Sequence, residues 1–259
     1  MDYNLHTHTK RCHHATGEPE DYVLAAIRDG MKLYGFSDHI PHQFPDGRES
    51  GYRVPMAEGV AYCEEIRALS EKYKEKIDIR VGFEAEYYPL YFEQMLKNAI
   101  DFGAEYLILG QHFIHNEHPN GRYVIRSDNE KDHLAAYSDM VIEAMRTGVF
   151  TYVAHPDVFQ YDIHAPEYEE QMRRICIAAR ENNTPLEINF LGIREKRIYP
   201  NMVFWRIAGE EKAPVTYGLD AHRTEDACDR ASLAVAQGMV EEYKLNYIGM
   251  PKMIDIRSK

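Results

Sequence analysis

Apolar residues follow two different spacings along the chain. Seven short segments are rich in branched and aromatic residues, the composition of buried β-strands. They are residues 2–9, 33–39, 77–88, 104–112, 149–158, 185–190 and 214–222. Between them, apolar residues recur every three or four positions, which predicts amphipathic helices. These helices are expected at residues 19–30, 55–76, 90–102, 129–148, 166–182, 204–211 and 225–242.

The alternation of strands and helices predicts the fold class. Parallel strands joined by helices require right-handed crossovers. Seven such units in 259 residues favour a closed or nearly closed barrel, and the sequence contains no glycine-rich phosphate loop of the GxGxxG or GxxxxGK type. We therefore expect an α/β protein, a distorted seven-stranded (β/α)7 TIM-like barrel forming a single domain over residues 1–259. Residues 41–55 and 115–127 are expected to be long βα loops.

Charge and cysteine content narrow the class of partners. The formal net charge of −12 disfavours an extended nucleic-acid groove, which normally carries a basic face. The four cysteines form no CxxC pair, so neither a disulfide framework nor a zinc finger is expected. They are Cys12, Cys63, Cys176 and Cys228. The first residues do not resemble a secretion signal, and no apolar run reaches the roughly 18 residues of a membrane span. We expect a cytoplasmic protein with no membrane partner.

Histidine and acidic residues recur near the ends of the predicted strands. Three pairs have members two residues apart, and on a strand such residues point to the same side. These pairs are His6 with His8, Glu84 with Glu86, and Asp220 with His222. Single candidates at other strand ends are Asp38, His39, His112 and His155. Only the sixth segment, PLEINF, differs. Since the carboxyl ends of parallel strands meet at one face of a barrel, the sequence predicts one common site.

The residue types at this site indicate metal binding. Neutral imidazole with carboxylate suits zinc, iron or manganese. The number of candidates exceeds one tetrahedral site, so two or three divalent ions are implied, at the spacing used for phosphoester displacement. One histidine at one strand end could be structural, but a set directed to one face is hard to explain that way. Five other histidines are expected to be scattered over the surface: His42, His115, His118, His133 and His164.

Six motifs carry a resemblance to a known family. HTHT, SDH, GFEAE, GQH, AHPD and GLDAH occur in this order between His6 and His222. As an ordered set they resemble the PHP (polymerase and histidinol phosphatase) superfamily. Within it, the EINFLGIR and FWRIAGEEKAPVTYGLDAH stretches look like the histidinol-phosphate phosphatase branch. The resemblance implies a distorted seven-stranded barrel with up to three metals. It also implies a phosphomonoester hydrolase, with L-histidinol phosphate in histidine biosynthesis as the first candidate substrate.

The resemblance also implies a ligand set for each metal. The first metal would take His6, His8, Glu84 and Asp220. The second would share Glu84 as a bridge and add His112 and His155. The third would take His39, His222 and one residue of the loop after HTHT, for which His14 is the first choice and His13 and Cys12 are alternatives. Glu86 and Asp38 are expected to support ligands rather than to bind metal.

The implied mechanism needs a nucleophile and cations around the phosphate. A hydroxide between the first two metals would attack phosphorus in line, with catalytic roles for Glu84, Asp220, His222 and Arg194. Arg194 is the first choice for binding phosphate, because its planar fork matches phosphate oxygens, and Arg197 is the second.

The loop after HPD departs from the branch, because VFQYDIH contains no arginine. Substitutes would be His164, Arg126 or Arg122. In the loop 44–53, Asp46 and Glu49 could face the ammonium group of the substrate.

Other interpretations remain open at the level of sequence. A PHP hydrolase could act on another small phosphorylated substrate, such as a nucleotide or phosphotyrosine, or could be an exonuclease. A non-catalytic metal-binding barrel is a second alternative. A metal-dependent amidohydrolase barrel also begins with HxH, but no lysine stands at a predicted strand end here. The sequence leaves the oligomeric state open.

Overall fold

A parallel sheet of eight strands forms the centre of the computed structural model, which describes residues 1–126 and 129–258. The strand order is β1-β2-β3-β4-β7-β8-β9-β10. In that order the strands are Tyr3–Asn4, Leu33–His39, Asp78–Ala85, Tyr106–Leu109, Phe150–Val153, Leu186–Asn189, Pro214–Gly218 and Asn246–Tyr247. Each of the seven expected segments contains one of them, so the α/β class and the parallel arrangement are confirmed.

The expected strand number is wrong by one. The additional strand, β10, has only two residues, both exposed, and pairs with Pro214 and Val215 of β9. Such a strand produces no apolar run in the sequence. A small antiparallel hairpin was also not expected, and its strands are β5 (Phe113–Ile114) and β6 (Arg122–Tyr123). This hairpin occupies most of the predicted loop 115–127, whose last residue lies outside the described residues.

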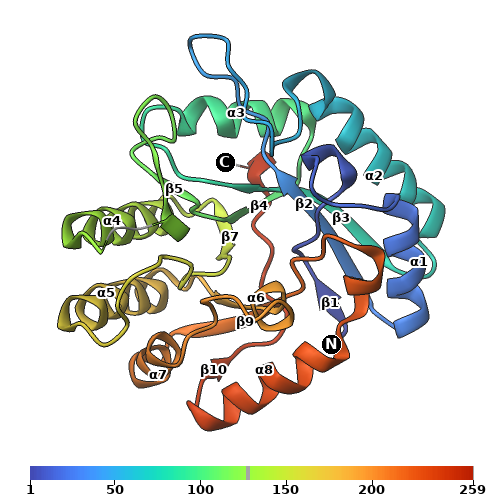
Figure 1. Cartoon of the computed structure of the whole chain (residues 1–259). Helices are drawn as coiled ribbons and strands as arrows, with labels where there is room; N and C mark the ends of the chain where they lie inside the picture. Colours follow the sequence, from blue (N-terminus) through green and yellow to red (C-terminus); the bar gives the residue numbers. More distant parts are fainter. Residues whose placement is uncertain (127–128, 259) are drawn as a thin grey trace.

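The sheet curls until its first and penultimate strands approach each other (Figure 1). Thr7 and Ala221, just beyond β1 and β9, form a parallel bridge, and the backbone N–H of His8 donates to the carbonyl of Ala221 at 2.9 Å. Within the two strands themselves, the hydroxyl of Tyr3 in β1 is hydrogen-bonded to Thr216 Oγ1 in β9 at 2.8 Å. The strand ends are therefore gathered around one axis.

Helices surround this curled sheet (Figure 1). They are α1 (Pro19–Asp29), α2 (Gly59–Tyr73), α3 (Phe92–Phe102), α4 (Lys131–Thr147), α5 (Pro166–Asn182), α6 (Phe190–Arg194), α7 (Met202–Glu211) and α8 (Arg230–Glu242). All except the short α6 and α7 fall in expected ranges, and α7 begins two residues before its expected start at residue 204. The ends of α1 illustrate why, since Pro19 occupies its first position and Gly30 ends it in the left-handed conformation. Within the described residues, no helix combines the length and apolar character needed to cross a membrane.

Apolar side chains form two clusters. The larger lies between the sheet and the helices. The smaller fills the inside of the curled sheet with Leu5, Tyr106, Ile108, Tyr152 and Ala154, against which Met253 packs. The C-terminal segment is held there because the N–H of Ile256 donates to the carbonyl of Glu105 at 2.9 Å. The interior is therefore packed, and an open cavity exists at the carboxyl ends of the strands.

Candidate metal centre

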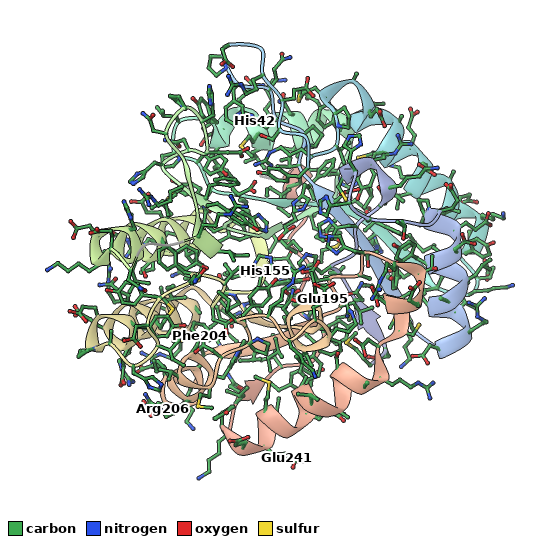
Figure 2. All side chains as sticks on the ribbon, viewed as in Figure 1. His42, His155, Glu195, Phe204, Arg206 and Glu241 are labelled. Atoms are coloured by element: carbon green, nitrogen blue, oxygen red, sulfur yellow. The ribbon has the colours of Figure 1, made fainter. Side chains whose placement is uncertain are left out.

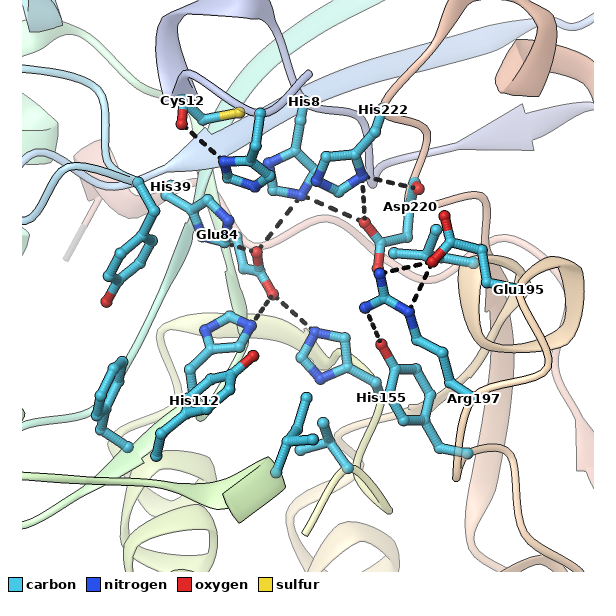
Figure 3. Close-up of a pocket in the computed structure, with 18 of the residues that line it drawn as sticks. His8, Cys12, His39, Glu84, His112, His155, Glu195, Arg197, Asp220 and His222 are labelled. Carbon is cyan, nitrogen blue, oxygen red and sulfur yellow. Dashed lines mark hydrogen bonds and ion pairs between the residues drawn. The ribbon is translucent and has the colours of Figure 1, made fainter. Parts of the chain in front are cut away.

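A cavity of about 780 Å³ lies at the carboxyl ends of the strands. Figure 2 shows His155 and Glu195 near the centre of the molecule, whereas Arg206 and Glu241 lie on peripheral helices. Eight of the expected ligands line the cavity: His8, His14, His39, Glu84, His112, His155, Asp220 and His222, and all of these except His14 are labelled in Figure 3. His6 is fully buried against them. The structure therefore brings together side chains that are up to 216 residues apart, as from His6 to His222.

The side chains expected around the first metal converge on one point. The Nε2 atoms of His6 and His8 lie 3.3 Å apart. His8 Nε2 is 3.5 Å from Glu84 Oε2 and 3.4 Å from Asp220 Oδ1, and the corresponding distances from His6 Nε2 are 3.7 and 3.6 Å. A tetrahedral ion with bonds of about 2.0–2.2 Å separates its ligand atoms by roughly 3.3–3.6 Å. These four residues therefore fit one cation.

Asp220 adds a second sign of a missing positive partner. Its Oδ1 is buried and accepts no hydrogen bond from the described residues, although it lies within ion-pair distance of three histidines. Buried carboxylate oxygens are normally paired, because an unpaired charge is costly to bury. A metal ion would satisfy this atom.

Glu84 has the geometry of a bridge between two ions. Its Oε2 faces His6 and His8, whereas its Oε1 lies 2.9 Å from His155 Nε2 and 3.5 Å from His112 Nε2. Oε2 also lies 3.1 Å from His39 Nδ1, so histidines surround both carboxylate oxygens. The second group of candidates therefore lies beside the first and shares this residue.

The third group surrounds the ring of His14. Its centroid is 4.9 Å from that of His222 and 5.3 Å from that of His39. His14 Nδ1 is 2.7 Å from the carbonyl oxygen of Cys12, which leaves the other ring nitrogen for a ligand. His13 also lines the cavity, at the left-handed end of a short 3-10 helix, and the thiol of Cys12 donates to the carbonyl of Thr9. Ligand atoms of His8, His39 and His222 lie within 4.8 Å of one another, whereas the choice among His14, His13 and Cys12 stays a prediction.

Three acidic residues contact the far nitrogen of a candidate ligand. Glu187 Oε1 is 2.8 Å from His6 Nδ1, and Glu86 Oε1 is 2.9 Å from His112 Nδ1. Asp38 Oδ1 is 3.4 Å from His8 Nδ1. Such contacts fix the tautomer and ring orientation of a metal-binding histidine and raise its basicity. The supporting roles expected for Asp38 and Glu86 agree with this geometry.

Glu187 is the functional residue that the sequence analysis missed. It lies in β8, the strand that seemed to contribute nothing, and its Oε2 accepts hydrogen bonds from the backbone of His155 and from Asn189 Nδ2. The same amide nitrogen also donates to Asp220 Oδ2 at 3.0 Å. The available signal was an acid two residues before an asparagine, both on the same side of a strand that is otherwise apolar.

Charge in the cluster is balanced by these contacts. Burial alone would lower the pKa of His6, but Glu187, Asp220 and Glu84 raise it to about 10. Burial would raise the pKa of Glu84, but the surrounding histidines, His112 first, hold it well below its usual range. The pKa of Asp220 is likewise lowered, against the effect of burial, by His6 and its other histidine neighbours. Both carboxylates are therefore ionised at neutral pH, the form that binds a cation.

Two candidate ligands occupy unusual backbone conformations. His155 has a φ of 30° and Asp220 a φ of 47°, values that are rare for residues other than glycine. Each costs on the order of 1–3 kcal/mol, and such costs concentrate at functional sites. Each lies two residues beyond the end of its strand, β7 or β9, so the turn there aims the side chain into the cavity.

The structure does not bring Arg194 to the cavity. Its guanidinium donates to the backbone carbonyls of Leu219 and Asp220 and pairs with Asp226 and Asp229 at 3.2 and 3.0 Å. These contacts use its donors to hold the end of β9. Arg194 therefore supports the backbone of Asp220, and the expected contact with phosphate has no geometric support.

Two other arginines line the cavity, namely Arg126 and Arg197. Arg197 donates to Glu195 at 2.7 Å and to the hydroxyl of Tyr199 at 3.1 Å (Figure 3). Its side chain is partly exposed at the cavity wall, and its Nε also donates to Glu195 at 2.9 Å.

The remaining loop candidates lie elsewhere. His164 lines a separate depression beside α5 and α7, and Arg122 is exposed on β6. In the loop after β2, Asp46 Oδ2 is 3.0 Å from His118 Nε2, and Glu49 accepts from the backbone N–H of Met56. Neither acid lines the cavity, so the geometry does not support contact between them and a substrate ammonium group.

Similar proteins in other organisms cover nearly the whole chain. A protein of Deinococcus radiodurans named "Probable histidinol-phosphatase" is 27% identical over 238 residues, which is 90% of each chain. The histidinol-phosphatase of Bacillus subtilis is 26% identical over 255 residues, covering 85% of this chain and 93% of the relative.

A solved structure shares the fold. The histidinol phosphate phosphatase of Lactococcus lactis, crystallised with zinc, L-histidinol and phosphate, superposes with a TM-score of 0.70. The match covers 99% of this chain and 97% of the other at 18% sequence identity, so it bears on the fold alone. A sequence model of the PHP domain matches residues 4–190. Because that match spans well over half of the 259 residues, the chain belongs to the PHP domain family.

Proposed function

We propose that this chain is a metal-dependent phosphomonoester hydrolase that acts on L-histidinol phosphate in histidine biosynthesis. The observation that carries the proposal is the position of Glu84, whose Oε2 faces three histidines and whose Oε1 faces two others inside one cavity. The Bacillus subtilis relative is named a histidinol-phosphatase, and the Lactococcus lactis neighbour binds L-histidinol and phosphate. Both are consistent with this substrate.

We assign the metal ligands as two or three groups. The first group is His6, His8, Glu84 and Asp220. The second is Glu84, His112 and His155. The third is His14, His39 and His222. Zinc, iron and manganese all suit this donor set, and the Lactococcus lactis neighbour contains zinc. Bound divalent ions would lower the pKa of water toward neutrality, which makes hydroxide available as a nucleophile, and would offset charge on the phosphate.

The residues of the chain have separate tasks in the proposed reaction. Arg197, with Arg126 on the same cavity wall, would hold the phosphate oxygens through its planar fork. The leaving alkoxide must be protonated by water or coordinated as it departs, and we assign the positioning of that step to Asp220 and His222, whose Oδ1 and Nδ1 lie 3.3 Å apart. Arg194 would act indirectly, by holding the backbone on which Asp220 stands.

Two wider features belong to the same proposal. We infer one domain over residues 1–259, since the strand order follows the chain from end to end and both apolar clusters draw on distant segments. We also place the protein in the cytoplasm, where cysteines remain reduced. Its four cysteines are free thiols, three of them buried. Nucleic acid is not expected as a partner of this acidic chain.

The test is phosphate release by protein of measured metal content. The panel contains L-histidinol phosphate, nucleotides and p-nitrophenyl phosphate, with metal-stripped protein as the control. We expect the highest kcat/KM on L-histidinol phosphate. A higher kcat/KM on a nucleotide would overturn the substrate but keep the reaction class. Metal-loaded protein that hydrolyses none of the esters would overturn the class as well.

A further inference from the structure

A buried arginine outside the metal centre connects two cavity loops to a candidate ligand. Arg53, in the loop after β2, is only 2% exposed. Its Nη2 lies 2.8 Å from Glu86 Oε2 and 2.6 Å from Glu117 Oε2, and its Nη1 donates to the carbonyl of Ile40 at 3.2 Å. One guanidinium therefore joins a carboxylate just beyond β3 to a carboxylate in the β5–β6 hairpin.

The contact with Glu86 leads directly to the metal centre. Glu86 Oε2 faces Arg53, and its Oε1 is 2.9 Å from His112 Nδ1. The other ring nitrogen of His112 is 3.5 Å from the proposed bridge, Glu84. Arg53, Glu86 and His112 thus form an unbroken series of contacts that ends at the second group of ligands.

The contact with Glu117 leads to the cavity wall. Glu117 also accepts hydrogen bonds from the hydroxyls of Ser50, Tyr52 and Tyr88. Tyr52 from one loop and Phe113 from the other line the cavity, with ring centroids 6.2 Å apart. Glu117 has a φ of 59°, so its backbone is held in a conformation that non-glycine residues rarely adopt. The carboxylate of Glu117 therefore connects the loop after β2 to the β5–β6 hairpin.

The chemistry of this cluster requires arginine. Removing one partner from a buried ion pair leaves an uncompensated charge, which is strongly destabilising. Lysine would keep the charge, but its single ammonium cannot reproduce the planar fork that reaches Glu86, Glu117 and a backbone carbonyl together. Burial opposes the charged form, yet Glu86, Tyr52 and Glu117 raise the pKa of Arg53 well above its usual value.

We infer that Arg53 is a positioning residue for the His112 side of the metal centre. By fixing Glu86 it sets the tautomer and orientation of His112, and by fixing Glu117 it holds the cavity wall beside that ligand. The first group of ligands is oriented by other acids, Glu187 and Asp38, and does not depend on Arg53. The inference rests on the proposed metal centre and deepens it. It states that the first two groups of ligands are oriented by different charged residues.

The experiment compares metal affinities in Arg53→Met, Arg53→Lys and a matched control, Arg230→Met. Arg230 also pairs with an acid, Asp29, but is exposed and far along the chain in α8. Competition with a chelator, read by metal content, gives an affinity for each bound ion. We expect Arg53→Met to weaken the binding of one ion by roughly 10- to 100-fold and to leave the affinity for the other unchanged. Arg53→Lys should lie between, and Arg230→Met should match the wild type.

Three results would decide against the inference or against its foundation. Wild-type affinities for every ion in folded Arg53→Met would overturn it, as would equal weakening of all ions. If Arg53→Met does not fold, Arg53→Lys decides by the same criterion, with circular dichroism as the check of folding. A wild-type protein that binds only one ion would overturn the proposed centre and the inference together. Binding without hydrolysis of L-histidinol phosphate would remove only the substrate, because the affinities do not depend on it.

Discussion

The two ends of the parallel sheet bury different kinds of side chain. At the carboxyl end, buried histidines and carboxylates surround an open cavity. Toward the amino end, the interior holds apolar residues such as Leu5 and Tyr106, and the C-terminal segment packs across them through Met253. One short segment supplies both ends, since Leu5, directly after β1, belongs to the apolar cluster and His6, one residue later, belongs to the metal centre.

This difference separates function from stability along one axis. In parallel barrels, chemistry is placed at the carboxyl ends and packing at the opposite face. The polar end has unpaired buried atoms and strained backbone, which cost stability. The apolar end offsets that cost through burial. Substitutions at the polar end should therefore lower metal affinity and activity, whereas substitutions at the apolar end should lower the free energy of unfolding.

The largest effect is expected from Glu84→Ala at the polar end. It removes the residue proposed to bridge two ions, so activity should fall by more than the roughly 100-fold cost of losing a supporting residue. Bound metal should fall with it, while circular dichroism remains that of the folded protein. The control is Glu71→Ala, which removes an exposed glutamate of α2. Retained activity in Glu84→Ala would mean that Glu86 bridges, or that the site is wrongly assigned.

Glu187→Gln probes the same end through a supporting residue. The change keeps the shape but weakens the contact with His6 Nδ1, so we expect metal affinity to fall by roughly 10- to 100-fold. Glu181→Gln, on the exposed face of α5, is the matched control. Metal titration checks the result, and unchanged affinity would show that His6 needs no acidic partner.

Arg197→Met tests the proposed phosphate contact at the cavity rim. Loss of a charge-assisted contact worth about 1.5–3 kcal/mol should raise KM roughly 10- to 100-fold. Metal content should stay at the wild-type level, because Arg197 contacts Glu195 and Tyr199 rather than a ligand. Initial-rate kinetics with measured metal content provides the test. An unchanged KM would leave Arg126 as the phosphate-binding residue.

The polar end could be predicted from sequence because its ligands depend on local spacing. His6 and His8 are two residues apart in the segment after β1, where Thr7 bridges to Ala221, so they point to the same side, and strand ends must converge in a parallel barrel. Seven of the eight strands were predicted for a similar reason, since each has a buried apolar run of its own. Exposed β10 has no such run, which is why it was not predicted.

Contacts between distant residues could not be predicted in this way. Arg194 seemed available for phosphate because LGIR ends a strand-like segment, but Asp226 and Asp229, more than 30 residues later, take its guanidinium. Arg53 was not singled out at all, because Glu86 and Glu117 lie 33 and 64 residues further along the chain. The sequence therefore indicates candidate metal ligands better than it indicates the ion pairs that position them.

Tyr106→Phe tests the apolar end. The hydroxyl of Tyr106 donates to the carbonyls of Leu5 at 2.8 Å and Phe36 at 3.2 Å, both buried. Its removal should lower the free energy of unfolding by about 2 kcal/mol while metal affinity stays unchanged. Urea denaturation measures the first quantity and chelator competition the second. The control is Tyr243→Phe, a partly exposed tyrosine after α8. A loss of metal without a loss of stability would contradict the separation of the two ends.

The smallest effect concerns His42, which the sequence analysis wrongly placed on the surface. It is 3% exposed, lies against Phe44 and Tyr91, and its Nε2 has no hydrogen-bond partner among the described residues. Burial, with Arg53 nearby, lowers its pKa to about 4, whereas acidic neighbours raise that of His6 to about 10. His42 therefore differs from His6 in lacking a carboxylate partner, so burial decides the direction of its pKa shift.

The sign of the pH effect follows from the lowered pKa of His42. Above its unfolded pKa, near 6.5, both states are neutral and the residue contributes nothing to pH dependence. As the pH falls below 6.5, the unfolded chain takes up a proton that the folded chain refuses, so stability declines until the pH reaches about 4. In metal-free protein, His42→Leu should remove about 1 kcal/mol of this decline at pH 5.5. Urea denaturation from pH 7 to 5 measures it, and His164→Leu, at an exposed position, is the control. If the free energy of unfolding changes equally with pH in His42→Leu and His164→Leu, the burial of His42 has no effect on the pH dependence of stability.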